Sequence, residues 1–171
     1  MVAELISVGT EILLGNIVNT NAAYLAEKCA LLGLSLYHQS VVGDNEARME
    51  DTIRRALERS DVVILTGGLG PTKDDLTKEV TAKVFKKALC EDAHTKERIM
   101  EFFQKIHNGE KITENNWKQA LIPEGAIIVE NQNGTAPGLI VIGDEGSGYE
   151  GKRAILIPGP PNECIPMFET Q

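Results

Sequence analysis

A glycine-rich stretch between an apolar run and a helical pattern has the residue types of a phosphate-binding loop. It reads Gly67-Gly68-Leu69-Gly70-Pro71-Thr72-Lys73-Asp74-Asp75-Leu76-Thr77. The apolar residues 62–65 before it are typical of a buried parallel strand, and the spacing of Val80 and Val84 after it predicts a helix. Glycines let the backbone approach a ligand closely, and the first turn of a helix offers unpaired N–H donors. We therefore expect phosphate to be held by Gly67, Gly68, Gly70 and Thr72.

Two acids, Asp74 and Asp75, come directly after the glycines. We expect them in the first turn of that helix, where their charges would repel a phosphate. A divalent cation between carboxylate and phosphate would remove the conflict. A purely structural interpretation stands beside this one, since Thr72-x-x-Asp75 matches a capping box and acids stabilise a helix start. Capping explains the aspartates but not three glycines within four positions. The stretch matches neither the dinucleotide fingerprint nor the P-loop.

Other loops after expected strands add candidate ligand contacts. Glu11 follows the first strand, at the carboxyl end where open α/β sheets bind ligands, and it either orients a water or bonds only to backbone. Asp44 opens the second helix, where spacing alone slightly favours a simple N-cap. The small-residue loop 133–138 is either a turn or the second half of a phosphate or ribose cradle. The turn at Pro158 and Gly159 again frees backbone donors.

Alternating strand and helix patterns position these loops. Strands are expected at residues 3–8, 34–42, 61–65, 126–129, 139–142 and 154–157, the last two as a hairpin with a long tip. Residues 91–121 break the rhythm with two helical patterns and no strand, which predicts a helical insertion flanking the site. Within it, Trp117 is expected in the core rather than on a planar ligand, and His94 and His107 receive no role. The chain is expected to form one α/β domain over residues 1–171.

Composition limits the class of protein. The chain has 171 residues and a formal net charge of -8, and it contains no basic cluster, so a nucleic-acid partner is not expected. No apolar run reaches the roughly 20 residues of a membrane span, and no signal peptide is expected. The three cysteines are widely spaced in apolar surroundings, which predicts reduced core thiols and a cytoplasmic location.

Several motifs together give a resemblance to a known family. Gly9-Thr10-Glu11-Ile12-Leu13-Leu14-Gly15, Asn19-Thr20-Asn21, the glycine-rich stretch, Glu114-Asn115-Asn116 with Gln119-Ala120, Asn133-Gly134-Thr135-Ala136-Pro137-Gly138 and Pro158-Gly159-Pro160-Pro161 occur in this order. They resemble the N-terminal domain of the competence/damage-inducible protein A (CinA) family. That domain is similar to the molybdopterin-binding domain of MogA, MoaB and MoeA, which implies a three-layer α/β/α fold around a mainly parallel sheet. Nothing resembles the nicotinamide-nucleotide amidase domain that typically follows in this family.

The resemblance implies an activity and a set of residues. It implies divalent-metal-dependent hydrolysis of a nucleotide pyrophosphate such as ADP-ribose, with Mg, Mn or Co as the cation. Asp75, Asp74 and Glu11 are then the catalytic candidates, and Asp75 with Asp44 the metal ligands. The expected nucleotide contacts are Asn21, Asn133, Gly134, Thr135, Gly138, Pro158 and Gly159.

Two other possibilities stay open at this stage. The domain is alternatively a non-catalytic binding module for a molybdopterin or nucleotide, since MogA-like relatives bind a pterin phosphate. Leu69 stands where these relatives often have threonine, and Asp74 is typical of the CinA side. A domain that mainly mediates self-association is the third possibility, and a homo-oligomer, a dimer first of all, is expected.

Overall fold

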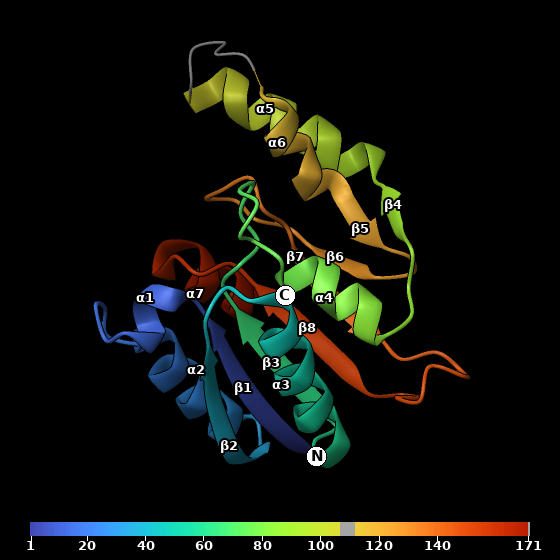
Figure 1. Cartoon of the computed structure of the whole chain (residues 1–171). Coiled ribbons are helices and arrows are strands. Elements are labelled where there is room, and N and C mark those ends of the chain that lie inside the picture. Colours follow the sequence, from blue (N-terminus) through green and yellow to red (C-terminus); the bar gives the residue numbers. More distant parts are fainter. Residues whose placement is uncertain (107–111, 171) are drawn as a thin grey trace.

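In the computed structural model, which describes residues 1–106 and 112–170, the central sheet has six strands (Figure 1). Their spatial order is β2-β1-β3-β8-β7-β6. Parallel pairing joins β1 (Val2–Val8), β2 (Ser35–Val42), β3 (Val62–Thr66) and β8 (Arg153–Ile157). The strand β7 (Gly138–Ile142) runs antiparallel to its two neighbours, β8 on one side and the edge strand β6 (Ile127–Val129) on the other. The expected mainly parallel sheet and the hairpin of its last two strands are confirmed.

Helices cover both faces of this sheet. On one face lie α3 (Glu46–Arg59) and α4 (Thr77–Val84), and on the other lie α2 (Thr20–Leu31) and α7 (Pro161–Thr170). Neighbouring residues of a strand point to opposite faces, so Val63 and Leu65 join the core under α3 while Ile64 joins the core under α2. The three-layer α/β/α arrangement expected from the resemblance is confirmed.

The chain reverses direction across the sheet beside β1. It passes from β1 through the short helix α1 (Thr10–Leu13) and α2 to β2 at the edge, and then returns through α3 to β3 on the other side of β1. Because the two crossover helices lie on opposite faces, a crevice opens beyond the carboxyl ends of β1 and β3. The short helix α1 that follows β1 carries Glu11, and the loop after β3 carries the glycines.

The inserted region differs in part from the sequence prediction. It contains the expected helices, α5 (Ala93–Ile106) and α6 (Glu114–Trp117), followed by a short 3-10 helix, η1 (Lys118–Ala120). It also contains an antiparallel pair that we did not predict, β4 (Leu89–Glu91) with β5 (Leu121–Pro123), because three-residue strands leave little alternation to detect. Figure 1 shows these elements together on one side of the central sheet. His107 lies outside the described residues.

Two further expectations are corrected here. Cys29 and Cys164 are buried as predicted, but Cys90 is exposed because it lies on the small β4–β5 sheet. The helix after the glycine loop begins at Thr77, so Asp74 and Asp75 precede it instead of occupying its first turn.

Among the described helices, none combines the length and the apolar character that crossing a bilayer requires.

A buried carboxylate on β1 provides a test of how this sheet is stabilised. Glu4 is 1% exposed, and Arg59 at the end of α3 binds both of its oxygens, at 2.9 and 2.7 Å. Removing the guanidinium leaves a desolvated charge, so we expect Arg59→Ala to lower the free energy of unfolding by about 2–3 kcal/mol. Urea denaturation followed by circular dichroism measures this difference.

The matched control lies on the same helix. Arg55 pairs with Asp51 at 2.9 Å, but both side chains are more than half exposed, so we expect Arg55→Ala to cost about 0.5 kcal/mol or less. Equal losses in the two variants would contradict a special contribution from burial of Glu4.

Candidate functional site

A cavity with a volume of about 750 Å³ lies at the carboxyl ends of the parallel strands. Val8 and Thr66, the last residues of β1 and β3, line it together with Pro158, which directly follows β8. The predicted site residues in its wall are Glu11, Asn21, Asp44, Gly67, Gly68, Gly70, Thr72, Asp74, Asp75, Asn133, Gly134, Thr135, Pro158 and Gly159. The topology thus brings together loops that are far apart in the sequence.

Gly138 is the exception. It does not line the cavity but starts β7 in the protein interior, where a Cβ would lie 2.7 Å from the Met167 side chain and 3.1 Å from the Leu156 carbonyl oxygen. The need for glycine at this position therefore comes from packing between the sheet and α7. Its expected contact with a nucleotide is not supported by this placement.

The glycine loop has a backbone shape that only glycines adopt easily. Gly67 and Gly68 have φ values of 95° and 68°, and a Cβ on Gly67 would lie 2.3 Å from the Val8 carbonyl oxygen. Thr77, the last residue of the glycine-rich stretch and not one of the predicted site residues, fixes this shape from the start of α4. It is 0% exposed, its hydroxyl donates to Gly67 O at 2.8 Å, and its N–H donates to Gly68 O at 3.1 Å.

This shape leaves backbone donors for a ligand. Within the described residues, the N–H groups of Gly68, Leu69 and Gly70 have no hydrogen-bond acceptor. Three successive free donors beside the start of a helix are typical of an anion-binding concavity. The loop can therefore hold a phosphate through its backbone alone.

Asp75 folds back on the loop that carries it. Its Oδ2 accepts hydrogen bonds from Thr72 N–H at 2.9 Å and from the Thr72 hydroxyl at 2.5 Å. This is the reach-back half of the expected capping box, formed in a single turn before the helix rather than at the helix start. Because both bonds go to Oδ2, the other oxygen, Oδ1, remains for a cation or ligand. The carboxylate also lies against Gly70, where a Cβ would be 2.6 Å from Oδ2.

Asp44 does not cap α3, because Asn45 is the N-cap and accepts from Arg48 N–H at 3.1 Å. Instead, Asp44 Oδ2 accepts from the N–H and the hydroxyl of Thr10, at 3.0 and 2.7 Å. It therefore ties the end of β2 to the loop after β1. Glu11, one residue further along, points its carboxylate at Gly9, where a Cβ would lie 2.6 Å from Oε1.

The third wall of the cavity comes from the loop before β7 and the start of α7. Asn131 donates to Glu163 Oε2 at 2.6 Å, and burial raises the pKa of Glu163 while this hydrogen bond opposes the rise. Gly134 packs against this pair, and a Cβ on it would lie 2.2 Å from Glu163 Oε2, so the Glu163 side chain would have to move. Asn21 reaches across from α2 and donates to Gly159 O at 2.6 Å. Glu163 is a wall residue that sequence reasoning missed, because only the fold places α7 beside this loop.

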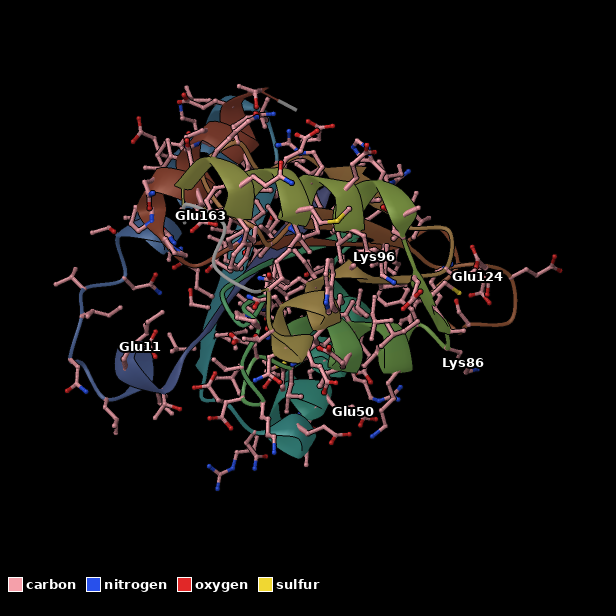
Figure 2. All side chains as sticks on the ribbon, turned by 90° about the horizontal axis from the view of Figure 1, so that it is seen from above. Glu11, Glu50, Lys86, Lys96, Glu124 and Glu163 are labelled. Carbon is pink, nitrogen blue, oxygen red and sulfur yellow. The ribbon has the colours of Figure 1, made fainter. Side chains whose placement is uncertain are left out.

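The electrostatics of the cavity are one-sided. Five carboxylates line it, and no Lys, Arg or His of the described residues does. They come from Glu11, Asp44, Asp74, Asp75 and Glu163; Figure 2 shows Glu11 on α1 and Glu163 on α7, on separate elements of this edge. An anion alone would be repelled here, whereas an anion bound together with a cation would not.

The metal ligands predicted from the sequence fit a cation only in part. Over residues 1–106 and 112–170, no group of three or more His, Cys, Asp or Glu side chains is placed to hold a metal ion. A complete cage of protein ligands is therefore not formed by these residues. Mg²⁺ commonly binds through one or two carboxylates together with substrate phosphates and water, and the free oxygen of Asp75 beside the donors of the glycine loop fits that manner of binding.

The inserted region fixes the acid-bearing loop from the other side. The ammonium group of Lys118 donates to Thr72 O at 2.9 Å and to Asp75 O, and Gln119 donates to Leu69 O at 3.2 Å. Lys78 in turn donates to Lys118 O at 2.5 Å, and burial lowers the pKa of Lys78 to about 8. These contacts join residues 40 or more positions apart, so the sequence alone gives no signal for Lys118.

The other residues weighed in the inserted region lie outside the main cavity. Trp117 is half-buried, and its ring centre lies 5.9 Å from Lys96 Nζ, so it neither belongs to the core nor faces the ligand space. His94 pairs with Glu130 at 3.1 Å on the surface.

Known proteins share both the sequence and the fold of this chain. The family model described as "Probable molybdopterin binding domain" matches residues 4–171. A CinA-like protein of Kosmotoga olearia is 55% identical over 170 residues, which are 99% of this chain and 39% of that protein. The chain thus spans about two fifths of the length of the curated relatives that it matches.

Solved structures agree with this relationship. The crystal structure of the protein CinA from Thermoplasma acidophilum has a TM-score of 0.83 and 38% sequence identity, covering 98% of this chain and 94% of the other. The molybdopterin biosynthesis enzyme MoaB from Thermus thermophilus has a TM-score of 0.62 at 15% identity, covering 98% and 87%. The second likeness concerns the fold alone.

The contacts of Lys118 make a prediction about the acid-bearing loop. Lys118→Met removes two charge-assisted hydrogen bonds to its carbonyls, so we expect amide hydrogen exchange in residues 70–76 to become at least about tenfold faster. Mass-spectrometric hydrogen exchange measures this change. Lys105→Met is the control, since Lys105 is exposed on α5 and lies 3.9 Å from Glu101. Unchanged exchange in the Lys118 variant would show that other contacts hold the loop.

Proposed function

The chain belongs to the probable molybdopterin binding domain family and, within it, to the CinA-like proteins, and from this premise we propose that it hydrolyses a nucleotide pyrophosphate with the help of a divalent cation. The substrate class is a nucleoside diphosphate derivative such as ADP-ribose, and the cation is Mg, Mn or Co. The products would be two phosphate monoesters, AMP and ribose phosphate in the case of ADP-ribose.

One observation carries the proposal: free backbone donors and a surplus of carboxylates share one cavity that no basic side chain of the described residues lines. The donors of Gly68, Leu69 and Gly70 favour a phosphate, whereas the five carboxylates disfavour any uncompensated anion. A diphosphate bound together with a divalent cation satisfies both groups. A ligand without phosphate would leave the loop donors unused, and a phosphate without a cation would leave the charges of the acids uncompensated.

Each residue then has a distinct task. The glycine loop orients the diphosphate, and Asp75, helped by Asp74 or Asp44, provides carboxylate oxygens for the cation. A divalent cation bound there would offset the negative charge that develops on the phosphoryl and leaving-group oxygens, and it would lower the pKa of a bound water molecule. Glu11 is the candidate that orients the attacking water and accepts its proton. Thr10 and Thr72 hold the carboxylates of Asp44 and Asp75 in place.

A second candidate function is a binding module for a pterin or nucleotide phosphate. The description of the matching family favours it, and so does the likeness of the fold to a molybdopterin biosynthesis enzyme. The same cavity would serve, with the glycine loop on the pterin phosphate. Tight binding of ADP-ribose without release of AMP would favour this second candidate.

Asp75 gives the decisive variant for hydrolysis. Asp75→Asn keeps an oxygen that can accept the hydrogen bonds of Thr72 but loses the charge that holds a cation, so we expect kcat/KM for ADP-ribose to fall at least about 100-fold. The measurement is AMP release with Mg, Mn or Co in turn. Circular dichroism should show an unchanged fold.

Asp51→Asn is the matched control, because Asp51 is an exposed acid on α3, outside the cavity. It should retain the activity of the parent chain. ADP-ribose cleavage that persists at the parent rate in the Asp75 variant would defeat the proposed role.

A further inference from the structure

The inserted region contributes a buried amide side chain to the wall of the cavity. Gln119 lies in η1, lines the cavity and is only 3% exposed. Its Nε2 donates to Leu69 O, an atom that can only accept, so the orientation of the amide is fixed and Oε1 must face away from that contact. Within the described residues, Oε1 has no hydrogen-bond partner. A buried acceptor without a partner is costly and calls for a donor from elsewhere.

Asn21 repeats this arrangement at the other glycine turn. Its amide nitrogen donates to Gly159 O at 2.6 Å, its Oδ1 is buried without a partner among the described residues, and it lines the same cavity. Gly159 itself lies against Gly67, because a Cβ on it would be 3.4 Å from Gly67 Cα. Two residues that line the cavity beside the phosphate loop thus each hold a buried amide oxygen without a hydrogen-bond donor among the described residues.

The chemistry of these acceptors selects the part of the ligand that meets them. An ionised phosphate has no proton to donate, so neither oxygen can bind the phosphate itself. In a nucleoside diphosphate the donors nearest the phosphates are the two ribose hydroxyls, whereas the donors of the base lie beyond the sugar. Gln119 makes a hydrogen bond to the carbonyl oxygen of Leu69, the middle residue of the proposed phosphate loop. The part of the ligand nearest to Gln119 is therefore the group next to the phosphate.

From this geometry we infer that Gln119 is a specificity-determining residue, whose Oε1 accepts a hydrogen bond from a ribose hydroxyl of a bound nucleoside diphosphate. The inference rests on the proposed function and adds the sugar to it. Lys118, the neighbouring residue, makes the acceptor rigid through its bonds to Thr72 O and Asp75 O. The inserted region therefore takes part in recognition and does not merely cover the cavity.

Calorimetric titration of the intact chain with Mg²⁺ and three probes tests the inference. The probes are ADP, 2′-deoxy-ADP and 3′-deoxy-ADP. The parent chain should bind ADP at least about tenfold more tightly than one of the deoxy probes, because that probe leaves the acceptor unpaired. Gln119→Met should weaken ADP binding about tenfold and reduce the preference over that probe to about twofold or less.

Gln104→Met is the matched control, since Gln104 is exposed on α5 in the same inserted region and is not part of the cavity wall. It should behave like the parent chain. If Gln119→Met lowers the melting temperature, Gln119→Ala takes its place in the same comparison.

The possible failures are distinguishable. A parent chain that binds all three probes equally, or a Gln119 variant that keeps the full preference for ADP, overturns the inference while nucleotide binding stands. A parent chain that binds no ADP in the presence of Mg²⁺ overturns the proposed function and the inference together.

Discussion

The close approach of three backbone segments at Gly67 is the constraint on which the rest of the site depends. A Cβ there would lie 2.3 Å from the Val8 carbonyl oxygen, whereas a Cβ on Gly159 would lie at an ordinary contact distance, 3.4 Å, from Gly67 Cα. The ends of β1 and β3 can therefore meet as closely as they do only because Gly67 lacks a Cβ, and the turn after β8 packs against the same point. Thr77 then locks the shape with two hydrogen bonds. The cavity exists because the three strands end at one place and their loops must diverge from it.

The distribution of charge around this point follows a consistent pattern. The carboxylates of Asp44, Asp74 and Asp75 line the cavity, whereas the ammonium groups of Lys118 and Lys78 bind backbone carbonyls behind the loop. The positive charges thus stabilise the fold of the loop without filling the space in front of it. The cavity stays electronegative, and a divalent cation is the natural counter-charge in it.

Much of this site could be predicted because its parts are local in sequence. Three glycines followed by two aspartates indicate a ligand loop wherever they follow a buried strand, and the contact between Thr72 and Asp75 spans only three positions. The sequence predicts a start of α4 that is too early, at Asp74 and Asp75 instead of Thr77. The reason is that a capping pattern can close a single turn without starting a helix. The role of Asp44 is harder to predict from the sequence, since its hydrogen-bond partner, Thr10, lies 34 positions away. Lys118 and Glu163 depend entirely on which elements the fold places side by side.

The two buried amides show why recognition and loop stability are linked in this fold. Gln119 uses its nitrogen to bind Leu69 O, and Asn21 uses its nitrogen to bind Gly159 O, so each amide first secures a glycine turn. The same bond fixes the direction of the remaining oxygen, which is left for the ligand. A change in either side chain therefore acts on the turn and on the ligand at once. Because Gln119 comes from the inserted region, ligand specificity can depend on a segment outside the central sheet, while the glycine loop and its acids lie at the carboxyl ends of the strands of that sheet.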